Sequence, residues 1–428
     1  MPGDTIQPPR RTPFIDIANR TFAIGQGAGI MDRSVLDKGA LMDRAADEAG
    51  LSDFGDPWFE RPLEVLLDAL KGEAQLNRSG EFTAEKTVLK VLRDRLWAAR
   101  WFEDHPEILA RPLPHPVAVV GPMRSGTTRM HRLLASDHRF SSLRSFETIS
   151  PVPRPDTAPG EDDARRVGIA RNIMRMARLA NPRTLSIHPT GPFETEEELG
   201  LLVNSFWGMK HEAQWMIPSY AKWSDETDPR PAYEQMARLL RLVSWTQSES
   251  SLRPWILKTP QYMLDLDTVI DTFPDARLIF THRDPLAVVG SAASLAWNQT
   301  ILYSDEADAH EMGELWLAKT RRQIENMRAA RERLDADRKI DVHYEEMESD
   351  WEGTMARIYR FLGMDIAPAL PAMHAYVERA AMHKRRPHKY SLSEFGLTED
   401  DVMAELGDYV RTYGITLENG QAKRRATS

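Results

Sequence analysis

Two kinds of hydrophobic pattern alternate along the chain. Between about residues 34 and 114, apolar residues recur at helical spacing, as at Leu63, Leu66 and Leu70 and again at Leu89 and Leu92. This spacing gathers them on one face of an amphipathic helix. We therefore expect a helical extension over residues 34–114, which serves as a cap on the rest of the protein or as the contact of a homodimer.

After this extension the pattern changes to short runs rich in β-branched and apolar residues, each followed by a turn or a charged segment. Such runs predict buried strands, and the long helical patterns between them are typical of a parallel sheet covered by helices. The expected fold is therefore a doubly wound, P-loop-like α/β domain. The four predicted strands are Pro116–Val120, Trp255–Leu257, Arg277–Thr281 and Ile340–Tyr344, and helices are expected over 161–180, 193–215, 231–250 and 308–334.

These elements predict four parts. Residues 1–33, rich in Pro, Gly and charge, are expected to form a flexible arm, followed by the helical extension 34–114, an α/β domain over 115–418 and a flexible tail over 419–428. The start lacks the apolar core of a signal peptide, and no uncharged stretch has the length of a membrane-spanning helix. We expect a cytoplasmic protein without membrane insertion.

Composition narrows the chemistry. The 428 residues carry a formal charge of −9, which gives no overall attraction to nucleic acid or an anionic membrane, so any anion site must be local. The chain has no cysteine, which excludes disulfides, thiolate nucleophiles and cysteine-bound zinc, and fits a reducing compartment.

One loop stands out as a local anion site. Gly121–Thr128, with the sequence GPMRSGTT, directly follows the first predicted strand and opens a helix, so backbone N–H groups and the positive helix end converge there. The glycine spacing matches the nucleotide P-loop, but Thr127 occupies the position of its lysine, and the cation is Arg124 instead. This arrangement suits an anion shorter than a triphosphate.

Here the residues resemble a known family. PMRSGTTRMHRLL is similar to the 5′-phosphosulfate loop of sulfotransferases, especially the bacterial branch related to the tyrosylprotein enzymes. The segment ARLIFTHRDPLAVVGS resembles the part of those enzymes that holds the 3′-phosphate of the donor 3′-phosphoadenosine 5′-phosphosulfate (PAPS). The resemblance implies that Arg283 and Ser291 bind the 3′-phosphate of PAPS. It also implies that the 5′ end of PAPS is bound by Arg124, Ser125, Gly126, Thr127 and Thr128.

The resemblance also implies catalytic residues. Sulfuryl transfer needs cations for charge that develops on the leaving phosphate and a base for the acceptor proton. Lys258, in the family-like segment LKTP, and Arg124 are the expected cations. Tyrosylprotein enzymes use a glutamate as the base, which points to Glu147, whereas His188, on a loop rich in Pro and Gly, is the alternative.

Two further donor contacts are expected. Tyr344 resembles the tyrosine that lies beside the adenine, with core packing as its alternative role. Lys389 belongs to the basic cluster KRRPHKY, which resembles a C-terminal element of the bacterial branch and is expected to close on the 3′-phosphate or to remain a solvated basic face. No metal is expected.

The expected reaction is sulfuryl transfer from PAPS to a hydroxyl or amine of a small acceptor, with an aromatic or lipid-like alcohol favoured. That preference rests on large apolar residues gathered before Lys258: Phe206, Trp207, Trp215, Met216, Tyr220 and Trp223. Two alternatives stay open, a P-loop-type kinase or NTPase and a non-catalytic scaffold that retains a nucleotide fold.

Overall fold

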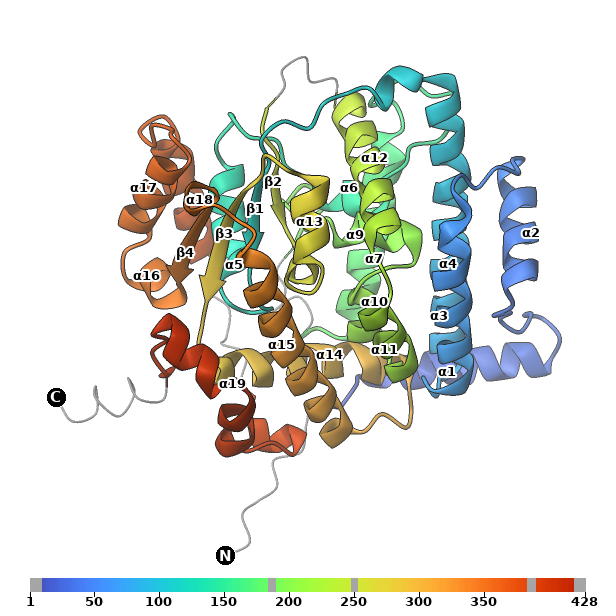
Figure 1. The fold of residues 1–428 in the computed structure, drawn as a ribbon. Coiled ribbons are helices and arrows are strands. Elements are labelled where there is room, and N and C mark those ends of the chain that lie inside the picture. The colour runs from blue at the N-terminus through green and yellow to red at the C-terminus, as the bar shows by residue number, and fades with distance from the viewer. Residues whose placement is uncertain (1–9, 184–189, 248–252, 383–389, 419–428) are drawn as a thin grey trace, which may run out of the picture.

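The computed structural model describes residues 10–183, 190–247, 253–382 and 390–418. Its centre is a four-stranded parallel sheet with the strand order β2-β1-β3-β4 (Figure 1). The strands are β1 (Val117–Val120), β2 (Ile256–Lys258), β3 (Arg277–His282) and β4 (Lys339–His343). The four predicted strands are thus confirmed to within one residue at each end, and a parallel sheet covered by helices is the α/β fold expected from the sequence.

Alternate residues of β1 face opposite sides of the sheet, as the two-residue period of a strand requires. Val117 and Val119 pack against α5 (Thr127–Ala135) and α17 (Trp351–Phe361). Ala118 and Val120 pack into the main core with the helices of the other face. Those helices are α12 (Arg230–Thr246), α13 (Leu266–Thr272), α15 (Ala309–Arg331) and α19 (Glu399–Tyr413).

The chain reverses its direction of travel across the sheet at β1. It passes from β1 to β2 on one side, then crosses to β3 on the other side, so that Val117 pairs with both Ile256 and Arg277. In open α/β sheets, ligands bind beyond the carboxyl ends of the strands at such a reversal. This edge is where the predicted anion loop leaves β1.

Four helices at the start of the chain form one end of the molecule, blue in Figure 1. Leu63, Leu66 and Leu70 share a buried cluster with Phe206, Trp215 and Tyr220, so the extension packs directly on the α/β domain. The four helices are α1 (Pro13–Gly27), α2 (Lys38–Ala49), α3 (Glu60–Gly72) and α4 (Arg78–Asp104).

Part of the expected N-terminal arm is ordered as helix α1. Asn19 accepts a hydrogen bond from the backbone N–H of Ser79 at 2.8 Å, and Arg11 forms an ion pair with Asp305 at 2.5 Å. Ile15 is the buried residue of this helix. The sequence contains few packing residues here, and these polar anchors to distant segments hold the helix in place.

The remaining helices and short turns connect these elements. None of the helices in the described ranges is long and apolar enough to cross a membrane. They are α6 (Ser145–Ile149), α7 (Asp163–Ala180), α9 (Leu199–Leu202), α10 (Lys210–Gln214), α11 (Pro218–Glu226), α14 (Pro285–Tyr303), α16 (Tyr344–Ser349) and α18 (Leu370–Met382), together with short 3-10 turns at Pro57–Phe59, Pro106–Ile108, Val203–Ser205, Pro260–Met263, Ala336–Arg338 and Leu392–Phe395.

Candidate active site

The loop after β1 approaches its neighbours so closely that two of its positions require glycine. A Cβ atom on Gly121 would lie 1.9 Å from Oγ1 of Thr281, which is far inside contact distance. Gly126 has φ +84°, and a Cβ atom there would meet the ring of Tyr344 at 3.0 Å. Glycine adopts positive φ without steric cost. The loop is therefore wedged between β3 and the start of α16.

Arg124 adopts an unusual backbone conformation within this loop. Its φ is +70°, in the left-handed region that non-glycine residues rarely occupy. Its Nε donates to Oγ of Ser291 at 3.1 Å, and its carbonyl oxygen accepts from Nη1 of Arg283. Backbone strain of this kind persists only where the surroundings fix it and is concentrated at functional sites. Here two other predicted donor-site residues supply those contacts.

Arg283 follows directly after β3 and connects several predicted residues. Its guanidinium lies 3.9 Å from the centroid of the Tyr344 ring and forms an ion pair with Glu418 at 2.6 Å. Ser291, on α14, is buried. The structure thus brings Arg124, Arg283, Ser291 and Tyr344 together, and Tyr344 opens α16 rather than ending β4.

Lys258 ends β2 and is buried at the same edge. Its Nζ donates to Oγ1 of Thr128 at 3.3 Å and to Oε1 of Glu197. Only 1% of Lys258 is exposed, so its charge is directed at these two partners. One cation thus touches both the anion loop and a carboxylate.

The side chain of Glu198 holds the backbone of Lys258 in place. Oε2 of Glu198 accepts from the backbone N–H of Lys258 at 2.8 Å and from the hydroxyl of Tyr262 at 3.2 Å. Complete burial raises the pKa of Glu198 to about 8. Burial disfavours the charged carboxylate more strongly than these hydrogen bonds stabilise it.

A cavity of about 590 Å³ lies against this edge. One wall carries the loop, Arg283, Tyr344 and the acids Glu196 and Glu197. The lining also includes apolar side chains from helices outside the sheet, with Ile149 from α6, Ile173, Met174 and Ala177 from α7, Met209 directly before α10, Ala213 from α10 and Leu295 from α14. Anion-binding groups and apolar side chains therefore line the same cavity.

Glu147 does not line this cavity, although its neighbours Ser145, Thr148 and Ile149 do. Its buried carboxylate accepts from the backbone N–H of Arg144 at 2.7 Å, pairs with the Arg144 guanidinium at 2.5 Å and accepts from Gln247 at 2.9 Å. Through these contacts, Glu147 caps the N-terminus of α6. The structure does not bring it to Lys258.

Other predicted residues are distributed as follows. Ser125 is buried and hydrogen-bonded to Thr281 at 2.7 Å, while Thr127 and Thr128 line the cavity. His188 and Lys389 lie outside the described residues. His282 is buried between Tyr409 and Asp341, at 3.0 and 2.8 Å.

Sequence reasoning missed the acidic residues beside Lys258. Glu196, Glu197 and Glu198 lie in the segment ETEEELG, whose run of carboxylates looks like a solvated surface. Tyr390 was also missed, and its ring lies against Gly290, one residue before Ser291. One signal was available in the sequence. The run of glutamates stands directly before the apolar residues of α9, so a glutamate next to that helix is expected to be buried with it, as Glu198 is.

The aromatic residues expected to form the acceptor pocket lie elsewhere. Phe206, Trp207 and Tyr220 are core residues because large apolar side chains gain most from full burial. Trp215 and Met216 line a separate cavity of about 270 Å³ between α10, α11 and α15. None of these residues lines the cavity of about 590 Å³ beside the loop.

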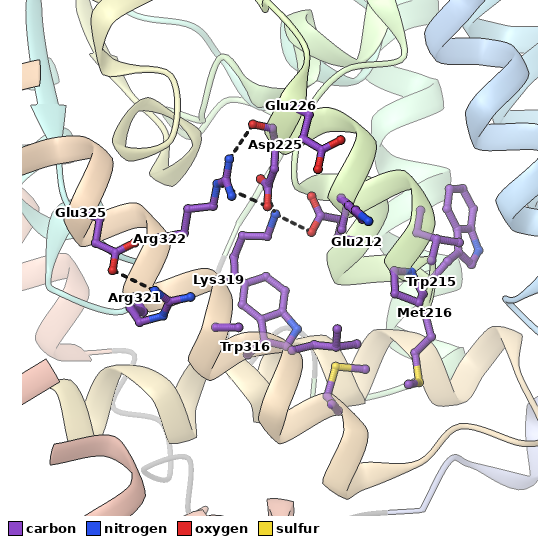
Figure 2. A pocket seen from close by; sticks show the side chains of 17 residues that line it. Glu212, Trp215, Met216, Asp225, Glu226, Trp316, Lys319, Arg321, Arg322 and Glu325 are labelled. Carbon is purple, nitrogen blue, oxygen red and sulfur yellow. Dashed lines mark hydrogen bonds and ion pairs between the residues drawn. The ribbon is translucent and has the colours of Figure 1, made fainter. Parts of the chain in front are cut away.

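Figure 2 shows that second cavity and the ion pairs at its edge. Nζ of Lys319 on α15 lies 2.8 Å from Glu212 on α10 and 3.3 Å from Asp225 on α11, and Arg322 also pairs with Asp225 at 3.4 Å. Lys319, on α15, thereby links α10 and α11.

Comparison with known proteins agrees with this geometry. The model of a family described as the sulfotransferase family matches residues 116–368. A curated relative is the omega-hydroxy-beta-dihydromenaquinone-9 sulfotransferase of Mycobacterium bovis, 22% identical over 306 residues that cover 70% of this chain and 75% of the relative. The corresponding protein of Mycobacterium tuberculosis matches equally well.

Solved structures extend the likeness to the whole fold. Sulfotransferase STF9 from Mycobacterium avium superposes with a TM-score of 0.80 at 26% identity, covering 91% of this chain and 99% of that one. Sulfotransferase STF1 from Mycobacterium tuberculosis has a TM-score of 0.74 at 29% identity and covers 87% and 99% of the two chains. Because the family model spans more than half of the chain and includes the loop, Lys258, Arg283 and Ser291, this protein belongs to the sulfotransferase family.

Proposed function

We propose that this sulfotransferase uses PAPS as its donor and transfers the sulfuryl group to a hydroxyl or amine of an amphiphilic small molecule. The observation that carries the proposal is the pairing of two cationic sites at one sheet edge. The loop and Lys258 form the first site, and Arg283 with Ser291 forms the second, joined through Arg124.

Two cationic sites match PAPS, because its ribose carries a phosphate at the 3′ position and a phosphosulfate at the 5′ position. Backbone N–H groups at the start of α5, with Thr127 and Thr128, suit the 5′-phosphosulfate. The guanidinium of Arg283 offers paired donors of the kind that bind a phosphate, and Ser291 adds a hydroxyl. Tyr344, stacked under Arg283, supplies an aromatic face for the adenine.

The reaction is an in-line displacement at sulfur. The acceptor oxygen or nitrogen forms a bond to sulfur while the bond from sulfur to the bridging phosphate oxygen breaks, and 3′-phosphoadenosine 5′-phosphate leaves. Negative charge grows on that phosphate, and Lys258 and Arg124 stabilise it. Burial of Lys258 strengthens this effect because the surrounding water is excluded.

We propose Glu197 as the base that takes the acceptor proton. Its carboxylate lines the cavity and touches Nζ of Lys258, so it lies at the junction of donor and acceptor spaces. Glu147, the base expected from sequence, would first have to leave Arg144 and Gln247. Proton transfer by a positioned carboxylate contributes about 10²–10⁴-fold to such reactions.

The apolar wall supports an acceptor with a hydrocarbon body. Ile149, Ile173, Met209 and Leu295 line the cavity with apolar side chains, and such surface binds lipid-like groups through water release. The name of the curated mycobacterial relative gives a menaquinone derivative as its substrate. A hydroxylated isoprenoid or similar alcohol fits both observations.

The first test is calorimetric binding of 3′-phosphoadenosine 5′-phosphate, with AMP and ATP as comparison ligands and without magnesium. We expect the bisphosphate to bind most tightly and Arg283→Gln to reduce its affinity toward that of AMP. Lys71→Ala, an exposed change on α3, serves as a control that should leave binding unchanged. A preference for magnesium-ATP would overturn the proposal.

A second test separates binding from chemistry. Lys258→Ala should retain binding of the bisphosphate within about tenfold but lose at least 100-fold in sulfuryl transfer, since the lysine acts on charge that develops in the transition state. Transfer is followed with labelled PAPS and a panel of alcohols. Undiminished turnover in this variant would remove Lys258 from the mechanism.

A further inference from the structure

The second half of α7 carries a surface that the reaction itself does not require. Ile173, Met176 and Leu179 are exposed by 47%, 51% and 47% of their surface. Isolated exposed apolar residues are ordinary, but three at successive turns of one helix form a row. This row, defined as Ile173, Met176 and Leu179, is called the apolar row of α7.

The apolar row is continuous with the wall of the catalytic cavity. Ile173 belongs to both, because it lines the cavity and is also half exposed. Met174 and Ala177, on the adjoining side of the same helix, line the cavity as well. The acceptor chamber therefore opens toward solvent along an apolar helix surface.

A row of positive charge accompanies the apolar row. Arg171, Arg175 and Arg178 are exposed and follow the i, i+4, i+7 spacing that places them on one face. Within the described part of the chain, no carboxylate pairs with any of the three. The first half of the helix differs, because Arg165 and Arg166 there pair with Asp162 and Asp163.

This contrast matters because the protein as a whole is acidic. The formal charge of −9 disfavours adsorption of the whole molecule to an anionic surface. An arginine row that has no carboxylate partner among the described residues can still attract such a surface over about one Debye length, roughly 10 Å. Helices that lie in a membrane interface combine apolar side chains on one part of their surface with Lys or Arg on another.

We propose that the second half of α7, residues 171–179, docks the protein on an anionic phospholipid bilayer. Met176 and Leu179 enter the interface between headgroups and acyl chains, and the three arginines contact the phosphates of the headgroups. This is peripheral binding by an exposed helix face. Its role, which rests on the proposed function, is to let an amphiphilic acceptor pass from the bilayer along Ile173 into the cavity.

The test is sedimentation of the full-length protein with vesicles, without donor or acceptor, so that its result does not depend on catalysis. We expect binding to vesicles of equal parts phosphatidylglycerol and phosphatidylcholine, little binding to phosphatidylcholine alone, and loss of binding as salt is raised. Replacing Arg171, Arg175 and Arg178 together by Gln should lower the partition coefficient on the order of 100-fold. Met176→Ser with Leu179→Ser should lower it about tenfold.

A matched control removes the same charge elsewhere. Arg328→Gln, Arg333→Gln and Arg360→Gln change a half-exposed arginine on α15 and exposed arginines next to α15 and on α17, and this variant should bind vesicles as the wild type does. The α7 variants should also retain binding of 3′-phosphoadenosine 5′-phosphate, which shows that they are folded.

Three outcomes would overturn the inference. They are equal binding of the wild type to both kinds of vesicle, equal loss in the α7 and control arginine variants, and a concentration-dependent dimer that disappears in the Met176 and Leu179 variant. The last result would assign the apolar row to contact with a second copy of the chain.

Discussion

Glu418 lies across the guanidinium of Arg283, with Oε1 2.6 Å from Nε and Oε2 3.2 Å from Nη2. The backbone N–H of Glu418 donates to Asp284 at 2.8 Å, which fixes the acid in this position. A carboxylate thus engages the same donors that we assign to the 3′-phosphate. The two anions should compete for one arginine.

The first prediction follows from this competition. Glu418→Gln should increase affinity for 3′-phosphoadenosine 5′-phosphate by about two- to tenfold, because the phosphate no longer displaces a charged group from a partly exposed pair. Affinity for AMP, which lacks the 3′-phosphate, should change little. Calorimetry with both ligands checks this, and Glu405→Gln on α19 is the control. Equal gains for both ligands would argue against competition at Arg283.

The second prediction concerns the base. Glu197→Gln should lower kcat by at least 100-fold with binding of the bisphosphate retained, because an amide cannot accept the acceptor proton. The matched control is Glu194→Gln, an exposed residue of the same segment, which should keep its activity. Steady-state assays at saturating PAPS measure both variants. Full activity in Glu197→Gln would return the role of base to Glu147 or His188.

The third prediction separates structure from catalysis at Glu147. Glu147→Gln should lower the melting temperature by a few degrees, because a buried carboxylate that caps α6 and pairs with Arg144 is lost. Turnover at a temperature well below melting should fall less than tenfold. Thermal unfolding and kinetics on the same preparation provide both values. Unchanged melting with lost turnover is the opposite pattern and would identify Glu147 as the base.

The fourth prediction concerns pH and Glu198. Burial raises its pKa to about 8 in the folded protein, above the value of about 4.3 expected for an unfolded chain. Between these two values the folded state holds a proton that the unfolded state has released. The free energy of unfolding should therefore decrease as pH rises from about 4.5 to 8 and then level off.

Glu198→Gln removes this titration, since an amide keeps the neutral form at every pH. Its stability relative to the wild type should improve as pH rises through the same range. Denaturant unfolding at pH 5, 6, 7 and 8 measures the difference. Parallel curves for the two proteins would show that Glu198 is ionised in the folded state.

The sheet and its loop could be predicted because their signals are local. The run PVAVV, the glycine spacing of Gly121 and Gly126 and the position of Arg283 after a strand depend only on neighbouring residues. Parallel strands then bring their carboxyl ends to one edge, which gathers Lys258, Arg283 and the loop without further information.

The acids around Lys258 could not be placed in the same way. Glu197 reaches the lysine from the segment 190–198 directly before α9, which has no regular secondary structure, and no periodicity indicates where such a segment runs. Glu147 follows the loop helix closely in sequence, but the short helix α6 turns its side chain toward Arg144. Long-range packing decides which of two nearby carboxylates reaches the site.

The two walls of the cavity come from different parts of the architecture. The proposed donor contacts arise at strand ends and the helix starts directly after them, whereas much of the apolar lining comes from α7, α14 and the start of α10. Substitutions at Ile173, Met209 or Leu295 should therefore reshape the cavity without moving Lys258 or the loop. Under the proposed function, sequence changes in these helices would alter which acceptor binds while the residues that carry the transfer chemistry stay unchanged.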